Sequence, residues 1–267
     1  MAFQFDTETQ LTEQSPGEWS LTLSDQWNIG DNPNGGYLLA PLLRGLSTLS
    51  PHSDPLSVTA HYLRPGSGNA SALVHGSLVR SGRNISTLRG SLEQAEKTRV
   101  EVLAAFGTLG AGSDQAPQVS IPAPEIPGPD QCRSRSGLEQ GVELLIQNRV
   151  EIRIHPDQVK AGGPEKAEIS GWIRFLDGRQ PDPLGLVLFA DVFPPPIFGL
   201  LGRIGWVPTI ELTVHIRRLP APGWVQAEFV TEDLHDGRMI ESGRLWDSTG
   251  ALVAQSRQLA MLLTPEG

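Results

Sequence analysis

The stretch DPLGLVLFADVFPPPIFGLLGRIGWVPTIELTVHIRR, residues 182–218, contains a predicted helix followed by a predicted strand. Asp182 and Pro183 form a typical helix start, because aspartate caps free backbone amides and proline suits the first helical position. The three prolines at 194–196 end or bend such a helix. We therefore expect a helix over residues 183–192.

Asp191 is predicted to point into the protein from this helix. Leu184, Val187 and Leu188 precede it at helical spacing and share its face. A carboxylate at the late end of a helix is disfavoured by the helix dipole, and burying it without a partner costs several kcal/mol. The pattern alone leaves two alternatives: a structural aspartate bonded to a loop amide or an arginine, or a functional carboxylate.

The strand at residues 209–217 alternates between apolar and polar residues. Strict alternation places Ile210 and Leu212 on one face and Thr209 on the other. By itself Thr209 would be an ordinary strand threonine, and Gln258, on a later strand, an ordinary solvated amide.

Strand-like patterns follow in both halves of the chain, and each half begins with a helix. In the first half the helix covers residues 34–46. The strands expected in the first half are 56–63, 70–80, 84–94 and 98–107. Those expected in the second half are 209–217, 224–233, 239–247 and 252–263.

The two halves resemble repeats of each other. His61 and the three residues after it match the stretch that begins at His215, 154 residues later. Gly82-Arg83 matches Gly237-Arg238, and Arg89 matches Arg244, both at a separation of 155. A strand-rich unit buries its helix on one sheet face, and two such units can join edge to edge. The predicted fold class is therefore a duplicated α+β fold.

A segment rich in proline, serine and glycine at residues 111–137 separates the repeats. We predict an N-terminal domain at residues 1–112, a linker at 113–137 and a C-terminal domain at 138–267.

Composition excludes several classes of protein. The net charge of −9 argues against a general nucleic-acid binder. The single cysteine, Cys132, cannot form an internal disulfide. The N-terminus lacks the pattern of a signal peptide, and the longest apolar run, LGLVLFA, is too short to span a bilayer. We expect a cytoplasmic protein without membrane insertion, metal or cofactor.

Six segments are informative when taken together. They are NPNGGYLLAPLL (32–43), VTAHYLRPG (58–66), SGRNISTLRGSLEQ (81–94), GLVLFADVFPPPIF (185–198), GWVPTIELTVHIRRLPAPGW (205–224) and DGRMIESGRLWDSTGALVAQSRQLAML (236–262). In this order they resemble the acyl-CoA thioesterase II (TesB-like) family of double-hotdog proteins, and the resemblance covers nearly the whole chain.

The resemblance implies two tandem hotdog domains, each an antiparallel sheet wrapped around a central helix. It also implies hydrolysis of acyl-CoA thioesters by a water that Asp191, Thr209 and Gln258 position. Subtracting the repeat offsets takes Asp191 to Tyr37 and Gln258 to Leu103, so we expect one site per chain. The triple proline after the helix and an interruption of the first helix at Pro41 depart from better-known members and affect the expected pocket shape.

Candidate substrate-binding residues are Gly35, Gly36 and Tyr37, whose backbone amides at a helix start could stabilise a developing oxyanion. The alternative is that Gly35 and Gly36 only make a tight turn into the helix. Five arginines are candidates for contacting the CoA phosphates: Arg64, Arg83, Arg217, Arg218 and Arg238.

A different class of function is a double hotdog that binds acyl-CoA or another apolar ligand without turning it over. Other enzymes fit poorly, since the chain has no Gly-x-Ser-x-Gly and no His-Glu-x-x-His motif. Hotdog hydratases, by family resemblance, carry a histidine five residues after the aspartate, where this chain has Pro196. The resemblance also implies a homo-oligomer of double-hotdog units.

Overall fold

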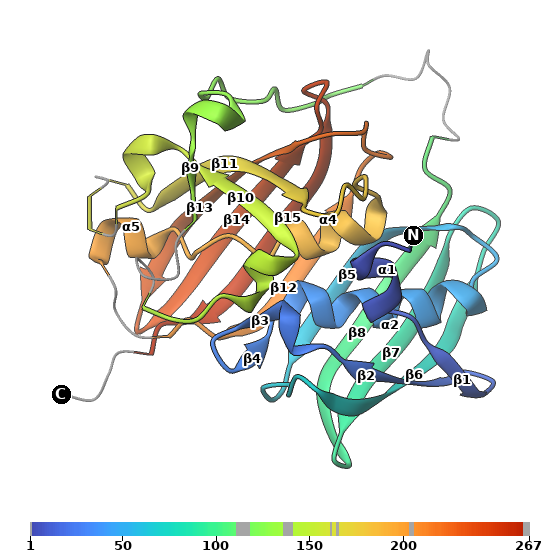
Figure 1. Cartoon of the computed structure of the whole chain (residues 1–267). Coiled ribbons are helices and arrows are strands. Elements are labelled where there is room, and N and C mark those ends of the chain that lie inside the picture. Colours follow the sequence, from blue (N-terminus) through green and yellow to red (C-terminus); the bar gives the residue numbers. More distant parts are fainter. Residues whose placement is uncertain are drawn as a thin grey trace.

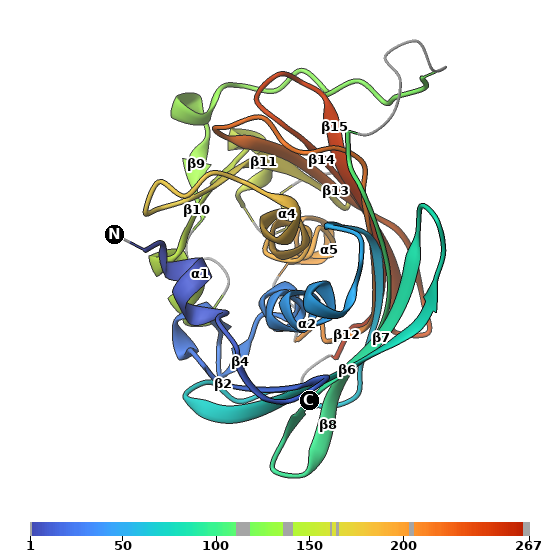
Figure 2. The ribbon, with the colours of Figure 1, turned by 90° about the vertical axis from the view of Figure 1, so that its right-hand side faces the viewer.

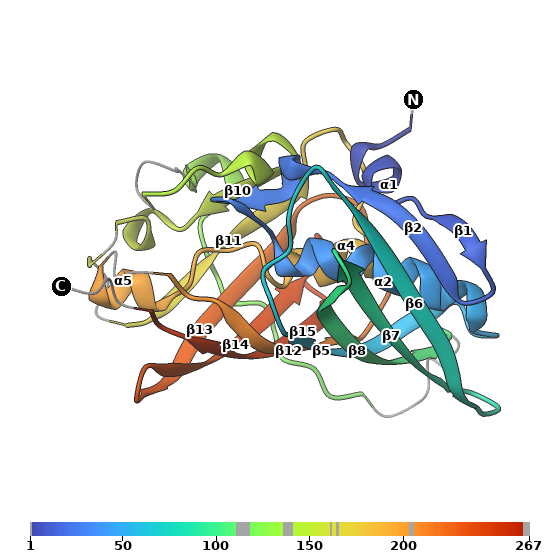
Figure 3. The same cartoon turned by 90° about the horizontal axis from the view of Figure 1, so that it is seen from below.

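The computed structural model describes residues 2–110, 118–135, 141–160, 162–163, 166–202 and 206–263. Within these residues a single antiparallel sheet of 13 strands curls around two central helices (Figures 1 and 2). Figure 3 shows the sheet running below the helices.

The first half forms the blue and teal part of the molecule in Figure 1. Its elements are α1 (Gln4–Glu8), β1 (Thr12–Ser15), β2 (Glu18–Leu23), β3 (Asn28–Ile29), β4 (Asn32–Pro33), α2 (Gly35–Leu49), β5 (Asp54–Tyr62), β6 (Ala70–Ser81), β7 (Ser86–Gln94) and β8 (Lys97–Gly107).

The second half repeats the plan of a helix followed by a meander. Its elements are β9 (Arg133–Ser134), β10 (Val150–Ile154), β11 (Glu168–Phe175), α4 (Pro183–Phe189), α5 (Ile197–Leu201), β12 (Thr209–Ile216), β13 (Val225–His235), β14 (Arg238–Trp246) and β15 (Leu252–Met261). The strand order of the large sheet is β1-β2-β6-β7-β8-β5-β12-β15-β14-β13-β11-β10-β9, and β3 and β4 form a separate pair. Helices α2 and α4 lie inside the curled sheet, so the predicted α+β double-hotdog fold is confirmed.

The two half-sheets join where β5 pairs with β12 in antiparallel register. At the centre of this seam the hydroxyls of Thr59 and Thr213 are 3.0 Å apart and pair directly across the strands. These threonines are separated by 154 residues, the offset found between the repeats. The local two-fold axis of the duplication therefore passes between them, and neither domain leaves a free edge there.

The eight predicted strands are all present, with ends shifted by at most two residues. Two helix predictions were wrong in detail. Pro41 does not interrupt α2, which continues through it to Leu49. The helix predicted at 183–192 ends at Phe189, so Asp191 lies in the turn after it. Strands β2, β10 and β11, which precede the helices and close the curled sheet, were not predicted from the sequence.

Part of the predicted linker lies outside the described residues. Residues 118–135 run along the second half, where backbone carbonyls accept hydrogen bonds from its strands. Trp246 Nε1 donates to Ile121 O at 2.9 Å, and Trp172 Nε1 donates to Pro127 O at 2.8 Å. The described part of this proline-rich segment is therefore attached to the second domain.

Helices α2 and α4 cross in close contact because Gly36 has no side chain. A Cβ at Gly36 would lie 2.9 Å from both the Cα and the carbonyl oxygen of Leu188 and 2.9 Å from the carbonyl oxygen of Val187. Asn34 caps α2 by accepting from Tyr37 N at 3.0 Å. Asp182 caps α4 by accepting from Gly185 N at 2.7 Å, as predicted.

Gly36→Ala should lower the free energy of unfolding by about 1–3 kcal/mol, because the backbone of α4 cannot move away from an added methyl group. This cost exceeds the gain of about 1 kcal/mol that alanine normally brings to a helix. Thermal denaturation measures the difference. Gly128→Ala is the matched control, since a Cβ there meets nothing within 4 Å. Equal melting temperatures for the two variants would contradict the contact.

Candidate active site

The carboxylate of Asp191 lies at the N-terminus of α2, in the opposite half of the molecule. Its Oδ2 accepts hydrogen bonds from the backbone amide of Gly36 at 2.9 Å and from Asn34 Nδ2 at 3.0 Å. The same Asn34 amide donates to the backbone carbonyl of Asp191 at 2.6 Å. The positive end of the α2 dipole therefore faces this carboxylate, which offsets its unfavourable place after α4.

Burial raises the pKa of Asp191 from 3.8 to about 6. The amides of Gly36 and Gly35 and the side chain of Asn34 act in the opposite direction, because they stabilise the ionised form. Asp191 is thus ionised at neutral pH and is a stronger base than an exposed aspartate.

Thr209 opens β12 on the inner face of the sheet, because a β-bulge lies between Thr209 and Glu211. Thr209 pairs with Ala260 and Leu212 pairs with Gln258, so all four side chains lie on one face. The strict alternation predicted from the sequence was wrong here: the extra residue of the bulge turns Thr209 to the face that holds Leu212.

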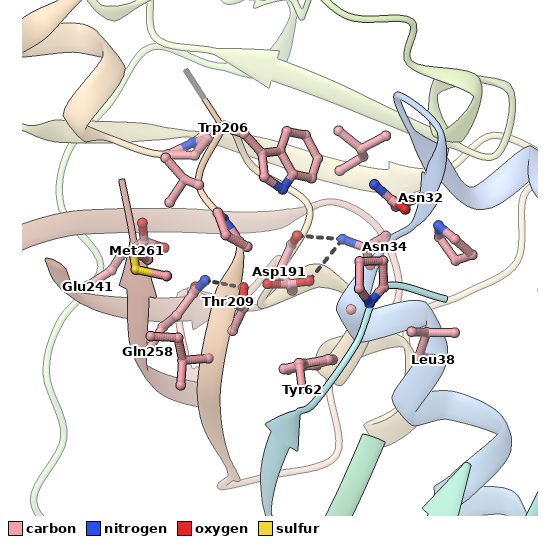
Figure 4. Close-up of a pocket in the computed structure, with 18 of the residues that line it drawn as sticks. Asn32, Asn34, Leu38, Tyr62, Asp191, Trp206, Thr209, Glu241, Gln258 and Met261 are labelled. Carbon is pink, nitrogen blue, oxygen red and sulfur yellow. Dashed lines mark hydrogen bonds between the residues drawn. The ribbon is translucent and has the colours of Figure 1, made fainter. Parts of the chain in front are cut away.

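Gln258 completes the group from β15. It is 9% exposed, and its Nε2 donates to the hydroxyl of Thr209 at 2.5 Å. Figure 4 shows this pair beside Asp191, with Asn34 on the far side of the carboxylate. The hydroxyl of Thr209 accepts from Gln258 and keeps its own proton for another partner.

A cavity of about 500 Å³ brings Asp191, Thr209 and Gln258 together. Its apolar wall includes Leu38, Phe193, Phe198, Trp206, Phe229, Met261 and Leu263. Its other polar groups include Asn32, Asn34, Tyr62, Arg64, Arg135 and Glu241. Among the described residues no cluster of His, Cys, Asp and Glu is suited to hold a metal ion, and no helix is long and apolar enough to cross a membrane.

The three predicted substrate-binding residues have different surroundings. Gly35 lines the cavity. Gly36 donates its amide to Asp191, so this amide is already used and cannot serve an oxyanion. Tyr37 lies outside the cavity lining: its phenol donates to Glu8 O at 2.9 Å and accepts from Ser24 N at 3.0 Å, and its ring stacks on Trp27.

Two family models match the chain and leave little of it uncovered. The acyl-CoA thioesterase N-terminal domain matches residues 23–110, and the acyl-CoA thioesterase C-terminal domain matches residues 121–262. The chain belongs to the acyl-CoA thioesterase family. The resemblance inferred from the sequence is therefore confirmed.

Similar proteins are known from bacteria and fungi. A crystal structure of a Thermobifida fusca protein described as a thioesterase II has 30% identity and a TM-score of 0.88, with 98% of each chain covered. The acyl-CoA thioesterase II TesB2 of Mycobacterium marinum shares the fold at 20% identity and a TM-score of 0.75, with 98% of each chain covered. The uncharacterized protein Rv0499 of Mycobacterium tuberculosis is 27% identical over 90% of this chain and 89% of its own length. The thioesterase-like protein TwmA of Talaromyces wortmannii is 24% identical over 98% and 92%.

The first half of the chain has apolar residues at the positions that correspond to Thr209 and Gln258. Strand pairing across β5 and β8 shows that Gln258 corresponds to Ala104, rather than to Leu103 as the sequence offset predicted. Thr209 corresponds to Pro55, which sits at a matching bulge. Both Pro55 and Ala104 are buried and apolar, so the described structure contains one such site.

Tyr62, at the end of β5, was missed by the sequence analysis. Its hydroxyl is buried and has no hydrogen-bond partner among the described residues. The Tyr62 hydroxyl lies near the Asp191 carboxylate, and both are beside Gly35. A Cβ added at Gly35 would be 2.8 Å from Asp191 Oδ2 and 2.9 Å from the Tyr62 hydroxyl. Burial, and then the charges of Asp191 and Glu211, hold the pKa of Tyr62 well above its usual value, so it remains a proton donor. No periodicity distinguishes Tyr62 from an ordinary strand tyrosine.

Of the five candidate arginines, Arg64 is the one that lines the cavity. It is exposed, follows β5 and donates to Thr98 O at 3.1 Å. Arg238 pairs with Asp236, and Arg218 bonds to Gln118, both at exposed positions.

Asn34→Ala should raise the pKa of Asp191 above its value of about 6, because it removes a donor to the ionised carboxylate. Carbon-detected NMR of protein with carboxyl-labelled aspartate measures this, with the signal of Asp191 identified by its loss in Asp191→Asn. Asn32→Ala is the control, since Asn32 lines the cavity without a bond to Asp191. A pKa that stays constant or falls in Asn34→Ala would count against the contact.

Proposed function

We propose that this protein hydrolyses acyl-CoA thioesters, with Asp191 as the general base and with Thr209 and Gln258 holding the attacking water. The observation that carries the proposal is the shared cavity, in which a buried carboxylate with a raised pKa faces a bonded threonine and glutamine pair. The family membership supports the reaction class.

Asp191 binds the water through Oδ1. Its Oδ2 already accepts hydrogen bonds from Asn34 and Gly36, so Oδ1 is the oxygen that faces the water in this proposal. One proton of the water points to Oδ1, and the water oxygen accepts a hydrogen bond from the Thr209 hydroxyl, which Gln258 orients. The remaining lone pair is then directed at the thioester carbon. A pKa of about 6 makes Asp191 a better base than an ordinary aspartate while it stays ionised at pH 7.

Tyr62 is suited to bind the thioester oxygen. Negative charge develops on this oxygen as water adds to the carbonyl carbon, and a buried donor without another acceptor stabilises it. When the tetrahedral intermediate collapses, the carbon–sulfur bond breaks and CoA leaves as a thiolate. The proton taken up by Asp191 then passes to the thiolate or to solvent, which regenerates the base.

The rest of the cavity fits the two ends of an acyl-CoA. The exposed guanidinium of Arg64 lies at the rim and can contact a phosphate. The aromatic and aliphatic wall formed by residues such as Phe198, Phe229 and Met261 can contact the acyl chain.

Asp191→Asn should lower kcat by about 10²–10⁴-fold, the usual contribution of a general base. Release of free CoA thiol from acyl-CoAs of increasing chain length measures this. If wild-type protein releases no thiol from any of them but binds them tightly, the protein is an acyl-CoA binding module instead. Activity of the variant equal to that of the wild type would remove Asp191 from the mechanism.

The pH profile of kcat/KM should rise with pH through about 6 and then level off, because Asp191 acts in its ionised form. Asp191 ionises near pH 4 in the unfolded chain but near pH 6 in the folded protein. The free energy of unfolding therefore falls as pH rises from about 4 to about 6, because only the unfolded chain loses this proton there. Asp191→Asn should therefore stay folded at neutral pH, as its melting curve would show. An acid limb that lies near pH 4 would contradict the assignment of the base.

Tyr62→Phe should lower kcat on the order of 10²-fold with a smaller change in KM, because the lost donor acts on the transition state. The chain has two tyrosines, so Tyr37→Phe is the matched control for removal of a phenol hydroxyl. Its hydroxyl is bonded to Glu8 and Ser24 outside the cavity lining, and its loss should change stability rather than kcat. Equal losses of kcat in both variants would point to a general structural effect.

A further inference from the structure

A row of polar side chains crosses the inner face of the second half-sheet. Gln258 on β15 pairs with Glu241 on β14, and Glu241 pairs with Thr231 on β13. Thr209 on β12 begins the row through its bond to Gln258. Thr209 and Gln258 are used by the proposed mechanism, whereas Glu241 and Thr231 are not.

The fold itself does not require this row to be polar. In the first half the corresponding positions follow from the same strand pairings, and they are occupied by Pro55, Ala104, Leu88 and Leu78. Pro55, Ala104 and Leu88 are buried apolar residues. The duplicated scaffold therefore closes equally well with an apolar row, and the polar row is a property of the half that carries the site.

Glu241 lines the cavity, and among the described residues its carboxyl makes no hydrogen bond or ion pair. The hydroxyl of Thr231, its neighbour on β13, is buried and unpartnered within the same residues. An unsatisfied buried polar group costs about 1–3 kcal/mol. The Glu241 carboxyl, which faces the cavity, is the member of this pair that a bound ligand can reach and hydrogen-bond.

Burial and the charge of Asp191 raise the pKa of Glu241 to about 8. At neutral pH the carboxyl is therefore mainly protonated, with an O–H donor and a carbonyl acceptor. In this state it can bind a neutral hydroxyl or keto oxygen. It is not suited to bind a cation.

The order of the strands fixes where Glu241 lies along a bound thioester. Arg64 follows β5, which pairs with one edge of β12, whereas Glu241 lies on β14, two strands away from β12 on the other side. A CoA group near Arg64 therefore directs the acyl chain past Thr209 and Gln258 toward Glu241. Neighbouring strands are roughly 5 Å apart, so Glu241 is one such spacing beyond Gln258, roughly four carbon atoms of an extended chain.

We propose that the preferred substrate is an acyl-CoA whose acyl chain carries a hydroxyl or keto oxygen a few carbons from the thioester, and that Glu241 binds this oxygen. The proposal rests on the thioesterase function proposed above. Glu241 acts here as a specificity-determining residue that touches the acyl chain and not the reacting water.

The test compares hexanoyl-CoA with 3-hydroxy-, 4-hydroxy- and 5-hydroxyhexanoyl-CoA. In wild-type protein at least one hydroxyacyl-CoA should have a kcat/KM at least tenfold above that of hexanoyl-CoA. Glu241→Leu should lower this ratio to about one. Glu241→Gln should keep part of it, because an amide also donates and accepts.

Glu232→Gln is the matched control, since Glu232 is exposed on the same strand as Thr231 and pairs with Arg257. It should leave the ratio as in the wild type. Melting curves of all variants show that they are folded.

The measurements distinguish a failure of this inference from a failure of the thioesterase function. Turnover of all four thioesters with a ratio near one in wild-type protein, or a ratio unaffected by Glu241→Leu, overturns this inference and leaves the thioesterase function standing. Equal losses for all four in Glu241→Leu would assign Glu241 to the CoA portion instead. If wild-type protein releases no thiol, the thioesterase function fails, and calorimetry with the same intact thioesters measures whether Glu241 still selects the hydroxyl.

Discussion

The contact between the Asp191 carboxylate and the N-terminus of α2 connects the fold to its chemistry. It joins the two halves of the chain, because the carboxylate comes from the second half and its donors, Gly36 and Asn34, from the first. The contact exists only because α2 and α4 approach closely, which the missing side chain at Gly36 allows. Helix packing, the ionisation of Asp191 and the position of the cavity all follow from it.

Duplication followed by divergence explains the asymmetry of this molecule. The halves share the helix, the meander and even the bulge near the start of β5 and β12, yet only the second carries polar residues at Thr209, Gln258 and Glu241. The first half instead supplies a helix N-terminus and the Tyr62 hydroxyl. A complete cavity therefore requires both halves, joined in the register that β5 and β12 define.

Two carboxyl groups in one cavity occupy different protonation states. Three donors, Gly35, Gly36 and Asn34, favour the ionised form of Asp191, and burial leaves its pKa at about 6. Glu241 has no such donors in the described part of the chain, and burial and the charge of Asp191 raise its pKa to about 8. Because their environments move the two pKa values apart, at neutral pH Asp191 can act as a base and Glu241 as a neutral hydrogen-bond donor.

Sequence periodicity determined the fold class, the eight strands of the two meanders and the repeat, because these depend on the local spacing of apolar residues. The motifs identified the family and named Asp191, Thr209 and Gln258, whose catalytic roles remain predictions. Tertiary structure alone decided that Thr209 faces inward, through one bulge residue, and that the Gly36 amide serves Asp191. It also revealed Tyr62 and Glu241. These features depend on contacts between residues more than a hundred positions apart or on strand register, which no local pattern encodes.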